Sequence, residues 1–137
     1  MTKHRDFPSR IAAWRRKFGD AFDGLLYGIQ TQSSLQVHYL CAIATMGIAA
    51  ILSLELWRWA VLLTCIAIVL SAEYMNSAIE QLVRAINPGH NSEIAKVLHL
   101  AAAAVLIASL LATAIGIITL ATPLQGLLQQ YLAQKSG

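Results

Sequence analysis

The sequence AEYMNSAIEQ at residues 72–81 places two carboxylates at the end of a long apolar run. If that run is helical, Glu73, Asn76, Ser77 and Glu80 follow the i, i+3, i+4, i+7 spacing and share one face. Acidic side chains on a membrane-embedded helix are costly to place, so they indicate a function by default. The stretch therefore predicts a polar functional site on an otherwise apolar helix.

The composition indicates a membrane protein. The chain has 137 residues, of which 57% are hydrophobic and 12% are charged, and its mean hydropathy is +0.59. A soluble domain carries about 25% charged residues. We therefore expect a small integral membrane protein with a single domain over residues 1–137. Cys41 and Cys65 lie in apolar stretches and fit neither a metal motif nor a disulfide framework, so both are expected to be small core residues.

The basic residues are concentrated before the first apolar span. Six of the ten Lys and Arg residues occur there: Lys3, Arg5, Arg10, Arg15, Arg16 and Lys17. The positive-inside rule then predicts a cytoplasmic N-terminus, and three crossings place the C-terminus outside. The first thirty residues are too polar for a secretory signal peptide. A nucleic-acid partner is not expected for this basic cluster, because it stands beside three membrane spans.

The N-terminal region is expected to lie on the membrane surface. Residues 1–9 are polar and are predicted to be disordered, whereas residues 10–31 carry apolar side chains at helical spacing with Arg and Lys between them. This pattern is typical of an amphipathic interface helix, with Trp14 at the depth of the headgroups. A soluble helix packed on its neighbours is the alternative interpretation.

Three transmembrane helices are predicted, at residues 35–54, 59–86 and 96–121. Each is long enough for a bilayer core of about 30 Å, which takes about 20 apolar residues.

The connections between the spans are short. The connection after residue 54 carries Trp57, which matches an aromatic belt, and it makes the first two spans an antiparallel hairpin. Turn formers at residues 87–92 break the chain, with Ser92 as the expected N-cap of the third span. The third span is expected to end at Pro123, before a short tail. The predicted fold class is an all-α membrane protein with an N-terminal interface helix and three transmembrane helices.

The two acids of the motif are predicted to do different work. Glu73 and Glu80 are seven residues apart, or about 10.5 Å along a helix axis, which is too far to share one proton or one metal ion unaided. Because the second span runs inward, Glu73 is the deeper, and its loss of hydration suits a general base. Glu80 is nearer the cytosol, where it can hold a divalent cation and, through it, a polyphosphate. Asn76 and Ser77 lie between them and can orient both.

Other interpretations of the same acids stay open. The acids can bind protons or cations in a transporter, snorkel to the interface, or form an ion pair between Glu80 and Arg84 four residues later. The sequence has no Gly-rich phosphate loop, no Cys/His zinc pattern and no Ser-His-Asp arrangement. Any nucleotide site would therefore differ from that of the soluble kinases.

The sequence EYMNSAIE at residues 73–80 resembles the hallmark of the prokaryotic diacylglycerol kinase and undecaprenol kinase family, which is Glu-x-x-Asn-Ser/Thr-Ala-Ile-Glu. The resemblance extends over roughly residues 14–121. Residues 32–38, QSSLQVH, look like the family's Glu-x-Asn-x-Arg-Ile-His segment, and residues 103–107, AAVLI, match the start of its third span.

The resemblance implies a homotrimer with sites at the subunit interfaces. It also implies transfer of the γ-phosphoryl group of ATP, with Mg²⁺, to a lipid hydroxyl of diacylglycerol or undecaprenol. The reaction would take place at the cytoplasmic surface of the bacterial inner membrane. In the family pattern Glu73 falls on the catalytic base, Glu80 on a magnesium-binding carboxylate and Asn76 on a polar active-site residue.

Some partner positions depart from the family pattern. Gln32 stands where the family has a second metal-binding carboxylate, and its amide oxygen can still contribute to the metal and nucleotide site. The family's Lys-Asp pair aligns with Leu98 and His99, which makes His99 a candidate nucleotide ligand. Lys96 or Arg84 is a candidate replacement for the missing phosphate contact. His38 is expected to be structural.

Three classes of function are compatible with these residues. A lipid kinase is the leading hypothesis. The alternatives are a non-catalytic relative that binds lipid or nucleotide without turnover, and a small proton-coupled exporter that uses Glu73 as its proton site.

Overall fold

The computed structural model describes residues 7–86, 89 and 91–136, and over these residues the chain is helical with short connections. Four helices follow one another in the chain: α1 (Phe7–Thr31), α2 (Ser33–Ile51), α3 (Leu56–Ile86) and α4 (Ser92–Ser136). Three of them, α2, α3 and most of α4, are long and apolar enough to cross a membrane. The predicted fold class, an all-α membrane protein, is confirmed.

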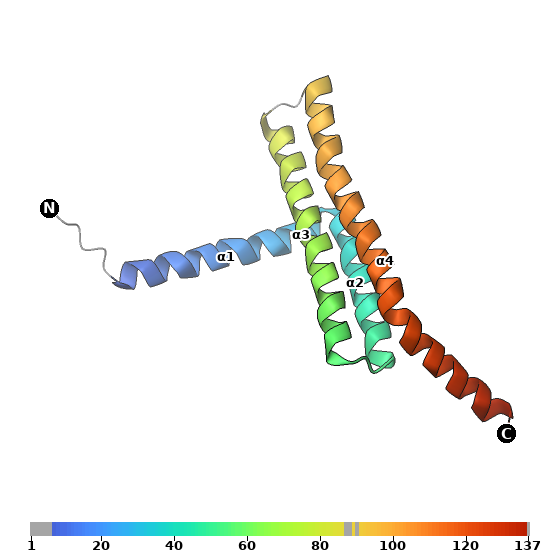
Figure 1. Ribbon diagram of the computed structural model, residues 1–137. Coiled ribbons are helices and arrows are strands. Elements are labelled where there is room, and N and C mark those ends of the chain that lie inside the picture. Colours follow the sequence, from blue (N-terminus) through green and yellow to red (C-terminus); the bar gives the residue numbers. More distant parts are fainter. Residues whose placement is uncertain (1–6, 87–88, 90, 137) are drawn as a thin grey trace.

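The three long helices stand side by side, and α1 leaves them at a steep angle (Figure 1). α2 and α3 form the expected antiparallel hairpin, and α4 runs back along α3. The apolar core of the chain is small: Leu35, Ala49, Leu62, Val69 and Val105. Most large apolar side chains face outward, as expected of a chain whose surroundings are lipid or further protein.

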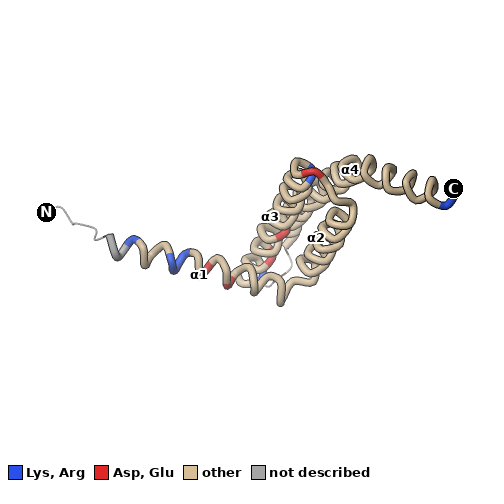
Figure 2. Tube along the Cα trace, turned by 90° about the horizontal axis from the view of Figure 1, so that it is seen from below, with Lys and Arg blue, Asp and Glu red and all other residues tan. Residues whose placement is uncertain are grey.

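Charge is confined to a few places (Figure 2). Lys and Arg gather on the N-terminal half of α1, acids occur on α1 and α3, and α4 carries no charged side chain between Lys96 and Lys135. Along α1 the large apolar residues Trp14, Phe18 and Phe22 are exposed, and the Lys17 ammonium lies 5.7 Å from the centre of the Trp14 ring. This exposed, mixed surface fits the interface helix that the sequence predicts.

Helix boundaries differ from the predicted ones at several points. α1 begins at Phe7, so residues 7–9 of the predicted disordered tail are helical, and residues 1–6 lie outside the described part of the chain. α3 begins at Leu56 rather than at residue 59, because the Glu55 carbonyl accepts the backbone N–H groups of Arg58 and Trp59. In the hairpin turn Ser53 adopts a left-handed φ of 49°. Few side chains adopt that conformation without cost, so the reversal of the chain is concentrated there.

The start of α4 is also corrected. Asn91, not Ser92, is its N-cap, since the Asn91 Oδ1 atom accepts the backbone N–H of Glu93 at 2.9 Å. Ser92 is already the first residue of the helix. Asn and Ser are both strong N-cap residues, so local preference alone did not separate the two positions.

The largest difference lies at the other end of α4. The third span was expected to end at residue 121, yet the helix continues through Pro123 to Ser136. Proline ends a helix mainly because it lacks the N–H that bonds to the carbonyl four residues earlier. Here that carbonyl belongs to Thr119, and the Arg58 guanidinium donates a hydrogen bond to it instead. The helix therefore passes the proline with its carbonyl satisfied.

Candidate functional site

The motif lies in the second half of α3, and its polar face is turned inward. Glu73, Asn76 and Ser77 are 3%, 8% and 6% exposed, whereas their neighbour Met75 is 64% exposed. Glu80, one turn further on, is half-buried. The predicted common face is therefore present. Burial of three polar side chains in so small a core indicates that the face serves more than packing.

Glu73 faces His38 across the contact between α3 and α2. The Nε2 atom of His38 lies 3.8 Å from a carboxylate oxygen of Glu73, and the His38 side chain is 24% exposed. A structural role for His38, as expected from the sequence, is compatible with this contact, which the sequence alone did not predict. The match of residues 32–38 to a family segment that ends in His was the signal that pointed to it.

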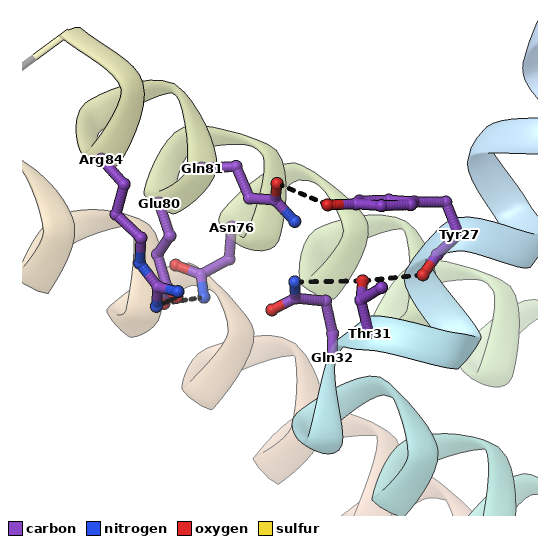
Figure 3. Close-up of polar contacts among 7 residues, drawn as sticks. All are labelled: Tyr27, Thr31, Gln32, Asn76, Glu80, Gln81 and Arg84. Atoms are coloured by element: carbon purple, nitrogen blue, oxygen red, sulfur yellow. Dashed lines mark hydrogen bonds and ion pairs between the residues drawn. The ribbon is translucent and has the colours of Figure 1, made fainter.

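A second polar group continues from Asn76 along α3 (Figure 3). The Asn76 Nδ2 atom donates to a Glu80 carboxylate oxygen at 3.0 Å, and the Arg84 guanidinium lies 3.4 Å from the other oxygen. The ion pair between Glu80 and Arg84, one of the alternatives from the sequence, is thus formed. The Asn76 Oδ1 atom is buried and has no hydrogen-bond partner. Burying a carbonyl oxygen without a hydrogen-bond partner costs free energy. A ligand or cation that binds this oxygen would remove that cost.

Gln32 lies between α1 and α2 and points toward this group (Figure 3). Its backbone is extended, and its side chain makes no capping bond to α2. The Nε2 atom instead donates to the Thr31 hydroxyl at 3.3 Å, which leaves the amide oxygen on the side of Asn76 and Glu80. Gln32 thus faces the motif in this view, and its role in a metal site stays a prediction.

The side-chain oxygens of Glu80, Asn76 and Gln32 can be compared with the ligands that Mg²⁺ prefers. Within residues 7–86, 89 and 91–136, no group of three or more His, Cys, Asp or Glu side chains could hold a metal. Mg²⁺, however, binds through one or two carboxylates and keeps waters and phosphate oxygens for its remaining positions. One carboxylate, from Glu80, with the amide of Asn76 bonded to it and the amide of Gln32 on the facing side in Figure 3, fits that pattern.

The remaining candidates lie apart from the motif's described contacts. His99 is exposed on α4, and those contacts do not include it. The Lys96 ammonium is 2.7 Å from a Glu93 carboxylate oxygen in the first turn of α4. Neither residue is brought against Asn76 or Glu80 by the contacts of this chain.

Sequence reasoning missed the contacts that hold α1 against the motif. The Tyr74 hydroxyl donates to the Leu25 carbonyl at 2.8 Å, and the Tyr27 hydroxyl donates to the Gln81 side chain at 3.1 Å. Gly28 is buried, and a Cβ atom there would overlap the Tyr74 ring.

The length of α3 indicates how deep the motif lies in the membrane. α3 has 31 residues, or about 46 Å at 1.5 Å per residue, which exceeds a hydrocarbon core of about 30 Å. If the core begins near the tryptophans at the start of α3, it ends near Asn76, where α1 joins the bundle. Glu73 then lies just inside the core boundary and Glu80 beyond it. This is the order of depth expected from the sequence.

An apolar cleft of about 420 Å³ begins beside this site. It lies between α2, α3 and α4, and its wall includes His38, Leu62, Val69 and Thr113. His38 therefore contacts the buried carboxylate and also lines the apolar cleft. The site thus joins an acidic group, an amide-rich polar group and a space for hydrocarbon.

The comparison with protein families is decisive. The family model of the prokaryotic diacylglycerol kinases matches residues 19–120. The chain belongs to the prokaryotic diacylglycerol kinase family. A relative from this family in Synechocystis sp., named diacylglycerol kinase, is 31% identical over 128 residues, which are 88% of this chain and 73% of the relative. No solved structure matches the chain. The resemblance noted on residues 73–80 is confirmed, and membership in this family makes lipid phosphorylation the first activity to test.

Proposed function

We propose that the chain transfers the γ-phosphoryl group of ATP, in the presence of Mg²⁺, to the hydroxyl group of diacylglycerol or undecaprenol. The observation that carries the proposal is the placement of Glu73. Its carboxylate is buried and lies 3.8 Å from His38, which also lines the apolar cleft, and the amide of Asn76 follows one turn later on the same face of α3. A lipid alcohol needs this combination, because its chains are apolar and its reacting oxygen is polar.

Glu73 acts as the general base. The carboxylate accepts the proton of the lipid hydroxyl as that oxygen forms its bond to the γ-phosphorus, and the bond from the γ-phosphorus to the oxygen of ADP breaks. The burial of Glu73 excludes water, which would otherwise compete with the lipid as acceptor. His38, whose Nε2 atom lies 3.8 Å from one oxygen of the carboxylate, positions that oxygen.

Glu80, Asn76 and Gln32 would hold the magnesium ion with its nucleotide. When bound, the ion neutralises charge on the phosphate oxygens, which is most of what phosphoryl transfer requires beyond positioning. Asn76 supplies its unpartnered Oδ1 atom, and its Nδ2 group fixes the Glu80 carboxylate. Arg84 competes for the same carboxylate until the nucleotide is present.

Assembly and orientation are part of the proposal. Three oxygen donors from one chain leave much of a nucleotide uncontacted, and the outward apolar surface of α2, α3 and α4 is available to further copies. A homotrimer with the site between subunits supplies the remainder. The basic N-terminal half of α1 favours a cytoplasmic N-terminus in the bacterial inner membrane and an outside C-terminus.

The test is a lipid-substrate panel. Purified protein is reconstituted into vesicles with diacylglycerol, undecaprenol or a control lipid without a hydroxyl group, and transfer of label from ATP is measured with and without Mg²⁺. Label should appear on at least one alcohol, and only with Mg²⁺. The absence of product on every alcohol would refute the proposal.

A non-catalytic relative is the second candidate, because the Arg84 guanidinium already neutralises Glu80. The same preparation separates the two cases through equilibrium binding of ATP. Magnesium-dependent binding without product on any lipid alcohol would favour the binding protein over the kinase.

A further inference from the structure

The C-terminal part of α4 is longer than a membrane crossing requires. α4 has 45 residues, or about 67 Å at 1.5 Å per residue, more than twice a bilayer core of about 30 Å. Its first turns run beside the end of α3, and its last turns continue past the α2–α3 turn (Figure 1). Residues 124–136 therefore extend beyond the bundle on the side away from α1.

The membrane boundary on that side can be located on α4. Trp57 and Trp59 open α3, and tryptophan collects at the depth of the headgroups. Arg58, between them, donates a hydrogen bond to the Thr119 carbonyl, so α4 passes this level at Thr119. The residues after Pro123 thus begin where the hydrocarbon ends.

Pro123 weakens the helix at the same level. It has no N–H to offer the Thr119 carbonyl, and that carbonyl is held by Arg58 of another helix. A proline is also a usual cause of a helix bend. Beyond it, the end of α4 leaves the bundle obliquely in both views (Figures 1 and 2).

The segment past Pro123 is amphipathic. Its large apolar side chains recur at i, i+3, i+4, i+7 and i+8 and are all exposed: Leu124, Leu127, Leu128, Tyr131 and Leu132. At 100° per residue they cover a face about 140° wide. Gln129 and Gln130 lie on the opposite face. The sequence has no acidic residue after Glu93, and Lys135 is the one charge of the tail.

A lipid surface fits this face better than a second copy of the chain does. A coiled-coil seam is narrower and needs three or four heptads, whereas residues 124–137 span two. An interfacial helix needs a wide apolar face and an aromatic at headgroup depth, which Tyr131 supplies. A segment without acids, ending in Lys135, is also compatible with anionic headgroups.

We propose that residues 124–135 lie in the headgroup region of the bilayer leaflet opposite α1, turned onto it at Pro123 and held at the boundary by Arg58. α1 and residues 124–135 would then be interfacial helices on the two opposite surfaces of one membrane. The proposal is independent of the kinase activity.

Spin labels at adjacent positions test it. Leu128→Cys and Gln129→Cys are made in the full chain with Cys41→Ala and Cys65→Ala, labelled, and reconstituted in vesicles of phosphatidylcholine and phosphatidylglycerol. Leu128 lies on the apolar face and Gln129 on the polar face, so each is the other's matched control. The label at residue 128 should be relaxed mainly by oxygen, which partitions into lipid, and the label at residue 129 mainly by a water-soluble nickel chelate.

Two results would overturn the proposal. Equal access of the nickel chelate to both labels would place the tail in water. Protection of residue 128 from both relaxants, with spin–spin broadening between copies, would place it on a second chain. Hydrogen exchange of the unaltered chain in lipid nanodiscs supplies a reading that needs no substitution: amides of residues 124–135 should exchange slowly, and rapid exchange would contradict the surface helix.

Discussion

The imidazole of His38 lies 3.8 Å from the carboxylate of Glu73, which joins the second turn of α2 to the middle of α3. The contact is made beside the apolar cleft and one turn before Asn76. It gives the proposed base a neighbour on another helix, so the position of the carboxylate depends on the packing of α2 against α3.

Replacing Glu73 with Gln should remove activity with little change of structure. Gln has nearly the same volume but cannot accept the hydroxyl proton. A general base contributes about 10²- to 10⁴-fold, so kcat for label transfer from ATP to the lipid should fall by that factor.

Glu55→Gln is the matched control, because Glu55 is an exposed carboxylate in the α2–α3 turn, where it accepts the Trp57 indole N–H. Its kcat should stay near that of the unaltered chain. Equal kcat for Glu73→Gln and the unaltered chain would exclude Glu73 as the base.

His38→Gln should lower kcat by about tenfold, the effect of about 1.4 kcal/mol in the transition state, and leave the KM for ATP near its original value. The side chain positions Glu73 but lies away from the Asn76–Glu80 group that would hold the nucleotide. Steady-state kinetics at varied ATP separate the two parameters. A rise in KM alone would mean that His38 contacts the nucleotide instead.

Glu80 and Arg84 should act on the magnesium requirement in opposite directions. Glu80→Gln removes the charged ligand and should raise the half-saturating Mg²⁺ concentration at least about tenfold, since tenfold corresponds to about 1.4 kcal/mol. Arg84→Gln frees the carboxylate and should lower that concentration by up to about fivefold, because the pair is partly exposed and such pairs are worth about 0.2–1 kcal/mol.

Magnesium titration of lipid phosphorylation, after removal of divalent ions with a chelator, measures both shifts. If the two substitutions move the half-saturating concentration in the same direction, Glu80 is not the metal ligand.

Gly28→Ala should loosen α1 from the bundle. A Cβ atom at residue 28 would overlap the Tyr74 ring and crowd the Leu35 side chain. Overpacking of this kind costs about 1–3 kcal/mol. Thermal unfolding in detergent should therefore occur at a lower temperature, and trypsin should cleave α1 at Arg15 or Arg16 sooner.

Gly24→Ala is the comparison, because a Cβ atom at residue 24 meets no heavy atom within 4 Å. Alanine is favoured over glycine in a helix by about 1 kcal/mol, so this variant should be as stable as the unaltered chain or more so. If Gly24→Ala lowered the unfolding temperature as much as Gly28→Ala does, the loss of stability would come from replacing a glycine in α1 and not from contact with Tyr74.

Local patterns in the sequence predicted much of the fold and part of the site. The three spans follow from apolar runs, and the common face of Glu73, Asn76, Ser77 and Glu80 follows from the helical repeat. Both properties depend on residues a few positions apart on the same helix. The match to the family hallmark likewise lies within eight consecutive residues.

Contacts between helices could not be obtained in the same way. The approach of His38 to Glu73, the bond from Tyr27 to Gln81 and the closeness of Gly28 to Tyr74 depend on how far each helix is rotated and shifted against the next. Several rotations bury similar apolar area, so hydrophobicity alone does not choose among them.

The end of α4 shows the same division. From the sequence, Pro123 predicts the end of a helix, because a proline leaves a carbonyl without its donor. Only the tertiary structure brings the Arg58 guanidinium, from 61 residues earlier in the chain, to the Thr119 carbonyl. The sequence by itself determined which segments are helical and apolar, since these depend on neighbouring residues. The tertiary structure decided where helices meet and where α4 ends, since a partner from a distant segment can satisfy a group that local rules leave unpaired.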